Sequence, residues 1–179
     1  MRGLLVGRFQ PFHLGHLAAI RAARKTHPDE PLMLGIGSAQ ESHTLLNPFT
    51  AGERVEMVER ALDEAKVDET RVYPIPDVQR HAVWVAHVRS LLPRFSRVYT
   101  NNPLTRILFE DEGYAVEAPE LEDRERFQGT RIRDRIRFGQ PIEDLVPPAV
   151  LAFLEEVGGI DRIRLLSAQG PSVTPEHPR

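Results

Sequence analysis

Short apolar runs recur along the first two thirds of the chain, separated by longer amphipathic stretches. The runs are RGLLVG (2–7), PLMLGIG (31–37), RVYPIP (71–76), RVYT (97–100) and YAVEAP (114–119). Nearly continuous apolar runs bounded by Gly, Pro or polar residues are typical of strands buried on both faces, as in a parallel sheet. We therefore expect five strands at these positions.

The stretches between the runs carry apolar residues at helical spacing. They are LGHLAAIRAARK (14–25), NPFTAGERVEMVERALDEA (47–65), AVWVAHVRSLL (82–92) and PLTRILFEDEG (103–113). Thr50 and Glu53 have the spacing of a capping box, and Gly113 is suited to end the fourth helix. Strands that alternate with helices predict an α/β fold, a Rossmann-like parallel sheet with helices on both faces.

The C-terminal third has a different pattern. GTRIRDRIRFG (129–139) and PPAVLAFLEEVGGIDRIRLLS (147–167) have helical spacing and predict a C-terminal helical cap. The last stretch, AQGPSVTPEHPR (168–179), is polar and rich in Pro, which is typical of a disordered tail. We expect a single domain over 1–167 and a tail over 168–179.

Composition limits the classes of function. The 179 residues hold 23 Lys and Arg, 26 Asp and Glu and no Cys, giving a net charge of −3. The charge argues against a nucleic-acid partner, and the missing Cys excludes disulfides, thiolate metal sites and Cys nucleophiles. No apolar run is long enough to cross a membrane, and the N-terminal apolar run is too short for an expected signal peptide. We expect a cytoplasmic protein without a membrane or nucleic-acid partner.

The residues that follow the first strand are the strongest candidates for chemistry. Ligands of open α/β sheets bind beyond the carboxyl ends of the strands. The stretch GRFQPFHLGH places Gly7, Arg8, His13, Gly15 and His16 there, where a helix begins. Free N–H groups at a helix start attract phosphate, and the two imidazoles and the guanidinium add donors. This pattern predicts a phosphate site, although two His three apart are by themselves more often a helix cap and a surface residue.

This stretch resembles the H-x-G-H signature of a nucleotidyltransferase superfamily. GIGSAQESHT, NPFTAGER, AVWVAHV, NNPL and GTRIR follow in the order and spacing of the archaeal-type nicotinamide-nucleotide adenylyltransferases. The resemblance covers about residues 1 to 166. It implies adenylyl transfer from ATP to nicotinamide mononucleotide (NMN), giving NAD and pyrophosphate by direct in-line attack, without a covalent intermediate.

The resemblance also implies roles for individual residues. His13, His16, Arg8 and Arg133 are expected to be catalytic, with His16 nearest the reacting α-phosphate. Arg131 and Arg135 are expected on a solvated helix face. The residues expected to bind ATP are Gly7, Arg8, Phe9, His13, Gly15, His16, Asn101, Asn102, Phe127, Thr130 and Arg133. Mg²⁺ is expected to arrive with the triphosphate, without a metal site of the protein's own.

Four residues are expected to bind NMN. By resemblance, Trp84 stacks on the nicotinamide ring and Asp77 binds the acceptor nucleotide, with His81 and Ser38 beside them. A lone Trp on an amphipathic helix is otherwise more often a core residue. Ser38 is as well explained by a tight turn after the second strand as by a ligand contact.

Three features depart from the family pattern and leave alternatives open. Relatives usually carry Asn where this chain has His81, their stretch around PIPDV is about two residues longer, and they often have Ser in place of Gln128. The alternatives are another acceptor, such as nicotinate mononucleotide, flavin mononucleotide or phosphopantetheine, and a non-catalytic sensor of ATP or NAD. The resemblance further implies a homo-oligomer, a hexamer in archaeal relatives.

Overall fold

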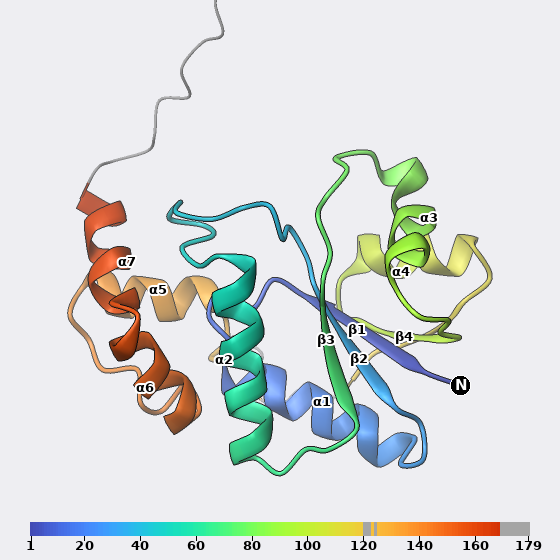
Figure 1. Ribbon diagram of the computed structural model, residues 1–179, viewed down its shortest axis with the longest axis horizontal. Coiled ribbons are helices and arrows are strands. Elements are labelled where there is room, and N and C mark those ends of the chain that lie inside the picture. Colours follow the sequence, from blue (N-terminus) through green and yellow to red (C-terminus); the bar gives the residue numbers. More distant parts are fainter. Residues whose placement is uncertain (120–122, 124, 169–179) are drawn as a thin grey trace, which may run out of the picture.

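The five predicted strands form one parallel sheet. A computed structural model of the protein describes residues 1–119, 123 and 125–168 (Figure 1). The strand order is β3-β2-β1-β4-β5, with β1 in the middle. From β1 the strands β2 and β3 extend to one side and, after a crossover, β4 and β5 extend to the other, so the strand order reverses between β1 and β4. This is where Rossmann-like folds bind their ligands. The strands are β1 Gly3–Gly7, β2 Leu32–Ile36, β3 Thr70–Pro74, β4 Arg97–Tyr99 and β5 Ala115–Glu117.

Helices cover both faces of this sheet, as predicted. The described residues form α1 Leu14–Thr26, α2 Ala51–Glu64, α3 His81–Leu91, α4 Pro103–Asp111, α5 Gly129–Arg137, α6 Pro148–Glu156 and α7 Gly159–Ala168. In Figure 1, α3 and α4 lie on one side of the strands, and α1 and α2 on the other. The C-terminal helical cap is confirmed as α5, α6 and α7. Ala168, which was assigned to the expected tail, is the last residue of α7, and 169–179 lie outside the described residues.

Alternating side chains of the strands supply two cores. Leu4, Met33 and Val98 pack with residues of α3 and α4, including the fully buried Phe109. Their sequence neighbours, such as Leu5 and Leu34, point to the opposite face and pack with α1, α2 and the C-terminal cap. Because side chains alternate across a strand, one apolar run serves both cores.

Helix caps fix the starts of the helices that border the carboxyl edge of the sheet. The Thr50 side chain accepts from the Glu53 N–H and the Glu53 side chain accepts from the Thr50 N–H, which confirms the predicted capping box. Arg162 of α7 donates to both carboxylate oxygens of Glu53, at 2.8 and 2.7 Å. The C-terminal cap thereby anchors the start of α2. Gly113 has φ +81, a conformation that favours Gly, just after α4.

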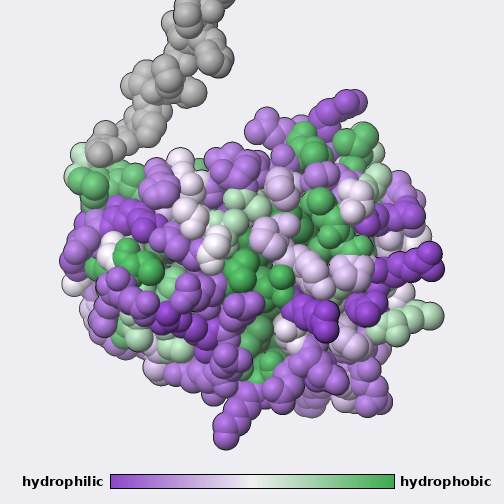
Figure 2. All heavy atoms as spheres, viewed as in Figure 1, coloured by the Kyte–Doolittle hydropathy of each residue, from purple (hydrophilic) through white to green (hydrophobic). Residues whose placement is uncertain are grey.

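The described helices are all too short or too polar to span a bilayer. On the face of the molecule in Figure 2, hydrophilic side chains prevail, and hydrophobic ones gather in its middle part.

Candidate active site

Two cavities open at the carboxyl edge of the sheet, on either side of the ends of β1 and β4. The first, here the histidine cavity, has a volume of about 450 Å³. The second, here the tryptophan cavity, has about 340 Å³. Val6, Thr100 and Asn102 line both. The two cavities therefore meet where the strand order reverses, and two ligands could touch there.

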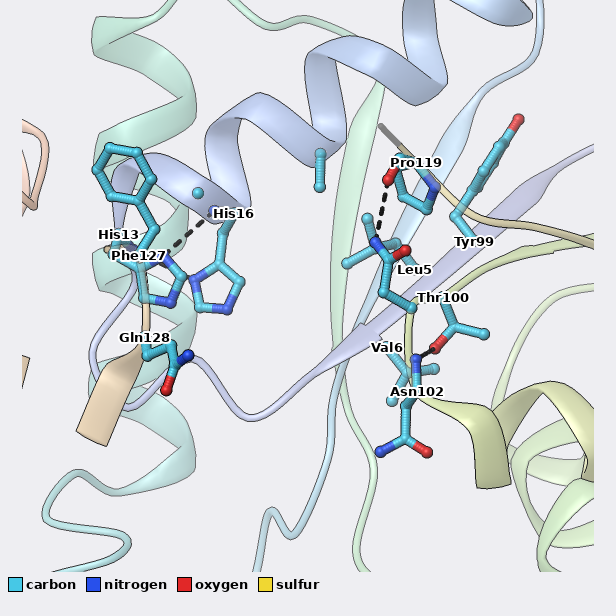
Figure 3. A pocket seen from close by; sticks show the side chains of 13 residues that line it. Leu5, Val6, His13, His16, Tyr99, Thr100, Asn102, Pro119, Phe127 and Gln128 are labelled. Carbon is cyan, nitrogen blue, oxygen red and sulfur yellow. Dashed lines mark hydrogen bonds between the residues drawn. The ribbon is translucent and has the colours of Figure 1, made fainter. Parts of the chain in front are cut away.

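Figure 3 shows the histidine cavity, with the two imidazoles at one end and the residues after β4 at the other. Asn101 donates from Nδ2 to the Pro119 carbonyl, at 3.0 Å, and the Asn102 N–H donates to Thr100 Oγ1, at 3.1 Å. These bonds shape the wall opposite the imidazoles. The lining residues are Leu5, Val6, His13, Gly15, His16, Ala19, Tyr99, Thr100, Asn101, Asn102, Pro119, Phe127 and Gln128.

The two histidines bind each other at the start of α1. His13 is the N-cap, and its Nδ1 accepts from the His16 N–H at 3.3 Å. The His13 N–H donates in turn to Nδ1 of His16 at 3.2 Å, and the rings stack with centroids 3.5 Å apart. Because both Nδ1 atoms accept, each neutral ring carries its proton on Nε2. Helix capping and donation to a ligand thus use opposite nitrogens of the same rings.

Burial keeps both imidazoles neutral. It lowers the pKa of His13 to about 4. The pKa of His16 also lies well below its ordinary value, because of burial and, secondly, the nearby His13. At neutral pH each ring is a neutral donor rather than a cation.

Aromatic packing supports these rings from behind. Phe9, 1% exposed, lies 4.7 Å from the His16 ring between centroids, and the Phe12 centroid is at 5.4 Å. Phe9 lines neither cavity, and its contact with ATP stays a prediction. Gly15 lines the histidine cavity, and a Cβ there would also lie 2.6 Å from Phe127 Cβ. The missing side chain of Gly15 lets the segment before α5 pack against the start of α1.

Arg133 and Thr130 of α5 lie beside the loop after β1 rather than in the walls of the two cavities. Arg133 is 4% exposed, and its Nη1 donates to the Gln10 carbonyl at 2.7 Å. Its Nη2 donates to Thr130 Oγ1 at 3.2 Å. Burial, and secondly the positive charge of Arg8, lower the pKa of Arg133 to about 10. Arg133 is therefore close enough to Arg8 for the two charges to interact.

The tryptophan cavity contains all four residues predicted to bind NMN. Ser38 follows β2, Asp77 follows β3, and His81 and Trp84 stand in the first turn of α3. The Trp84 indole packs edge-on against Phe109, with centroids 5.5 Å apart. Trp84 therefore both packs against the core and lines the cavity. The remaining lining residues are Val6, Gly7, Arg8, Gly37, Ile75, Thr100, Asn102, Leu104, Thr105 and Leu108.

Sequence reasoning missed two groups that shape this region. Thr100 stands between the cavities and is 7% exposed; its place directly after a strand was an available signal. Gln10 donates from Nε2 to the Phe49 carbonyl at 3.0 Å and accepts from the Phe49 N–H at 2.9 Å. Such bonds to a distant backbone leave no local pattern in a sequence.

Other histidines lie at the periphery. His27 contacts Glu117 at 3.1 Å, and His87 Nε2 lies 2.8 Å from the Pro76 carbonyl. The exposed His43 contacts Ser42 and lines neither cavity. His177 lies outside the described residues. Within the described ranges, no group of three or more His, Asp or Glu side chains has the arrangement of a metal site.

Comparisons with known proteins agree with this geometry. Residues 4–135 match the cytidylyltransferase-like family. A nicotinamide-nucleotide adenylyltransferase of Picrophilus torridus is 48% identical over 93% of this chain and 98% of the relative. The corresponding protein of Archaeoglobus fulgidus is 47% identical over 94% and 99%, respectively.

A more distant solved structure shares the fold. It is a bifunctional NMN adenylyltransferase/ADP-ribose pyrophosphatase from Francisella tularensis, complexed with AMP and a manganese ion. The TM-score is 0.66 at 19% identity, and the alignment covers 95% of this chain but 56% of that one. At this identity the likeness extends to the fold alone.

Proposed function

The chain belongs to the cytidylyltransferase-like family and, within it, to the nicotinamide-nucleotide adenylyltransferases, and we propose that its two cavities hold ATP and NMN for direct adenylyl transfer. The observation that carries this proposal is the meeting of the two cavities at Val6, Thr100 and Asn102. Two ligands that occupy them can bring a phosphate of one against the α-phosphate of the other.

The reaction requires alignment more than acid–base chemistry. The 5′-phosphate of NMN is already ionised at neutral pH, so no side chain has to remove a proton from it. One of its oxygens attacks the α-phosphorus of ATP, and the bond to the β-phosphate oxygen breaks as pyrophosphate leaves. Holding the two phosphates in line supplies much of the acceleration. The enzyme forms no covalent intermediate in this scheme.

We assign the polar groups of the site to the charge that develops during transfer. The Nε2–H groups of His13 and His16 donate to phosphate oxygens beside the start of α1. Arg8, with Arg133 behind it, provides positive charge near the leaving pyrophosphate. Neutral imidazoles suit a donor role, because they need no counter-charge before the ligand arrives. Asn101, Asn102 and Phe127 then line the side of the nucleoside.

The acceptor is assigned to the tryptophan cavity. The Trp84 face offers a stacking surface for a nicotinamide ring, and Asp77 and His81 offer polar groups for the ribose or carboxamide. A single His in place of the usual Asn can donate and accept, but not in the same two-point pattern.

We propose that Mg²⁺ enters with the triphosphate. Mg²⁺ keeps several waters and commonly binds through substrate phosphates and few protein ligands. The ion would neutralise charge on the β- and γ-phosphates.

We also propose a cytoplasmic homo-oligomer, a hexamer by resemblance to the family. Exposed apolar side chains on α3 and α4 support an association surface: Val83 is 40%, Leu104 45% and Ile107 53% exposed. Sedimentation analysis gives the mass of the assembly, and a monomer at micromolar concentration would contradict this proposal.

Pyrophosphate release from ATP and Mg²⁺ with four acceptors tests the function. The acceptors are NMN, nicotinate mononucleotide, flavin mononucleotide and phosphopantetheine, and the dinucleotide products are identified by mass. We expect the highest kcat/KM with NMN, accompanied by NAD. Transfer only to another acceptor would overturn the substrate. ATP binding without release from any acceptor would favour a nucleotide sensor.

A further inference from the structure

Arg54, in the first turns of α2, is an unusual buried cation. Its side chain is 0% exposed and is the largest of the fully buried side chains among the described residues. Burial, and secondly the charge of Arg8, lower its pKa to about 10. No carboxylate forms an ion pair with it within 1–119, 123 and 125–168. Burying a charge without an ionic partner is costly unless other groups solvate it.

Backbone carbonyl groups solvate this guanidinium instead. Nη1 donates to the carbonyls of Arg8, at 3.0 Å, and of Gly37, at 2.9 Å. The first follows β1 and the second follows β2, so one nitrogen joins the two loops. The other contacts of the guanidinium are Nε to the Thr50 carbonyl at 3.2 Å and Nη2 to the carbonyls of Ser38, Ala39 and Glu41 at 3.1, 3.4 and 3.4 Å.

The joined loops carry residues of the candidate site. Arg8 and Ser38 both line the tryptophan cavity, and their own carbonyls bind Arg54. The Gly37 N–H also donates to the Gly7 carbonyl at 2.9 Å. Any movement of Arg54 would thus displace two walls of that cavity together.

We propose that Arg54 is a positioning residue for adenylyl transfer, which holds the loops after β1 and β2 in register so that Arg8 and the acceptor wall face each other. This rests on the function proposed above. Arg54 itself touches no substrate. The helix start that carries Arg54 is held in place, because the Thr50 and Glu53 capping box and the ion pair of Glu53 with Arg162 fix the first turn of α2.

A lysine at this position cannot form the same set of hydrogen bonds. The guanidinium is planar and offers five N–H donors in two directions, whereas an ammonium offers three donors at one point. Arg54→Lys keeps the charge but can reach only part of the six carbonyls. The variant therefore separates the contribution of the hydrogen bonds from that of the charge.

The first test compares Arg54→Lys with the control Arg60→Lys. Arg60 lies nearly two turns further along α2, is partly exposed and pairs with Glu56 and Glu156. We expect Arg54→Lys to lower kcat about tenfold or more, as expected for misaligned reactants, with smaller changes of KM. Amides of 8–10 and 37–41 should exchange hydrogen at least about tenfold faster, while the central strands keep their protection. The Arg60→Lys variant should match the wild type in both.

Two results of this test would overturn the proposal. One is a folded Arg54→Lys variant with wild-type kcat and unchanged exchange in both loops. The other is faster exchange in all elements alike, together with an activity loss equal to the unfolded fraction, since that describes a purely structural residue.

A second measurement needs no variant and covers the case in which Arg54→Lys does not fold. Nuclear magnetic resonance of the wild-type guanidinium protons should give resolved Nη signals for Arg54 that exchange slowly with water, unlike those of Arg60. Nη protons of Arg54 that exchange as fast as those of Arg60 would show that the two loops are not joined, and the proposal would fail. This readout, and the loop exchange, are independent of the substrate, so an error in the proposed function would show separately as wild-type inactivity with NMN.

Discussion

The histidine cavity and the tryptophan cavity meet at three residues but are built in different ways. In the first, His13 is buried and His16 is half-buried, and they cap α1 and bind each other, so the groups that would contact phosphate also start a helix. In the second, Asp77 and His81 are exposed on a loop and at a helix start. The groups proposed to contact phosphate are thus tied to the folding of the chain, whereas Asp77 and His81 on the proposed acceptor side can change with little effect on the fold.

The largest expected effect is on the phosphate side. His16→Ala removes an Nε2 donor that is predicted to act in the transition state, and we expect turnover to fall about 10² or more. The free energy of unfolding should fall only by the cost of one helix-start contact, about 1 kcal/mol. Steady-state kinetics and thermal unfolding measure both.

The matched control is His27→Ala, at the other end of α1, which should keep wild-type turnover. Near wild-type turnover of His16→Ala would remove this residue from the mechanism.

The burial of His13 predicts a dependence of stability on pH. Its pKa is about 4 in the folded chain and near the ordinary value of 6.5 in the unfolded chain. Between about pH 6.5 and pH 4, His13 is therefore protonated in the unfolded chain but not in the folded chain. The stabilisation is complete above that pH and decreases as the pH falls toward 4.

Denaturant unfolding checks this. From about pH 7.5 to about pH 5, the free energy of unfolding should fall about 2 kcal/mol more in the wild type than in His13→Asn, which keeps a capping oxygen. Equal losses in the two proteins would show that His13 is not a buried neutral group.

The acceptor side should respond more selectively. Trp84→Ala removes a stacking surface worth about 1–3 kcal/mol, so the KM for NMN should rise about tenfold while the KM for ATP changes little. Some stability should be lost too, because the indole packs on Phe109. Trp84→Phe, which keeps an aromatic face, should recover most of the NMN affinity. An unchanged KM for NMN together with a lower melting temperature would make Trp84 a core residue only.

The smallest effect is expected from the C-terminus. Removal of 169–179 leaves both cavities and α7 complete, so kcat/KM should stay within about twofold of the wild type. Kinetics of the shortened chain measure this, and a large loss would mean that the C-terminus contributes to the site.

Local patterns in the sequence were enough to predict the strands, the Thr50 capping box and the meeting of His13 with His16. Each depends on residues a few positions apart. The division into two cavities depends on strand order, which no local pattern encodes. Arg54 and Gln10 were missed because their partners are backbone groups of distant loops, where any residue type would serve. The packing of Phe9 against His16 was not foreseen, because the motif does not tell a residue that supports a histidine from one that contacts the ligand.

The stereochemistry of transfer tests the central claim most directly, because the claim is that ligands in two adjoining cavities react in one step. An ATP analogue with a sulfur of known configuration on the α-phosphorus would be converted with NMN, and the configuration of the dinucleotide determined. One in-line attack predicts inversion at phosphorus. Retention would mean two successive displacements through a covalent enzyme intermediate and would contradict the account.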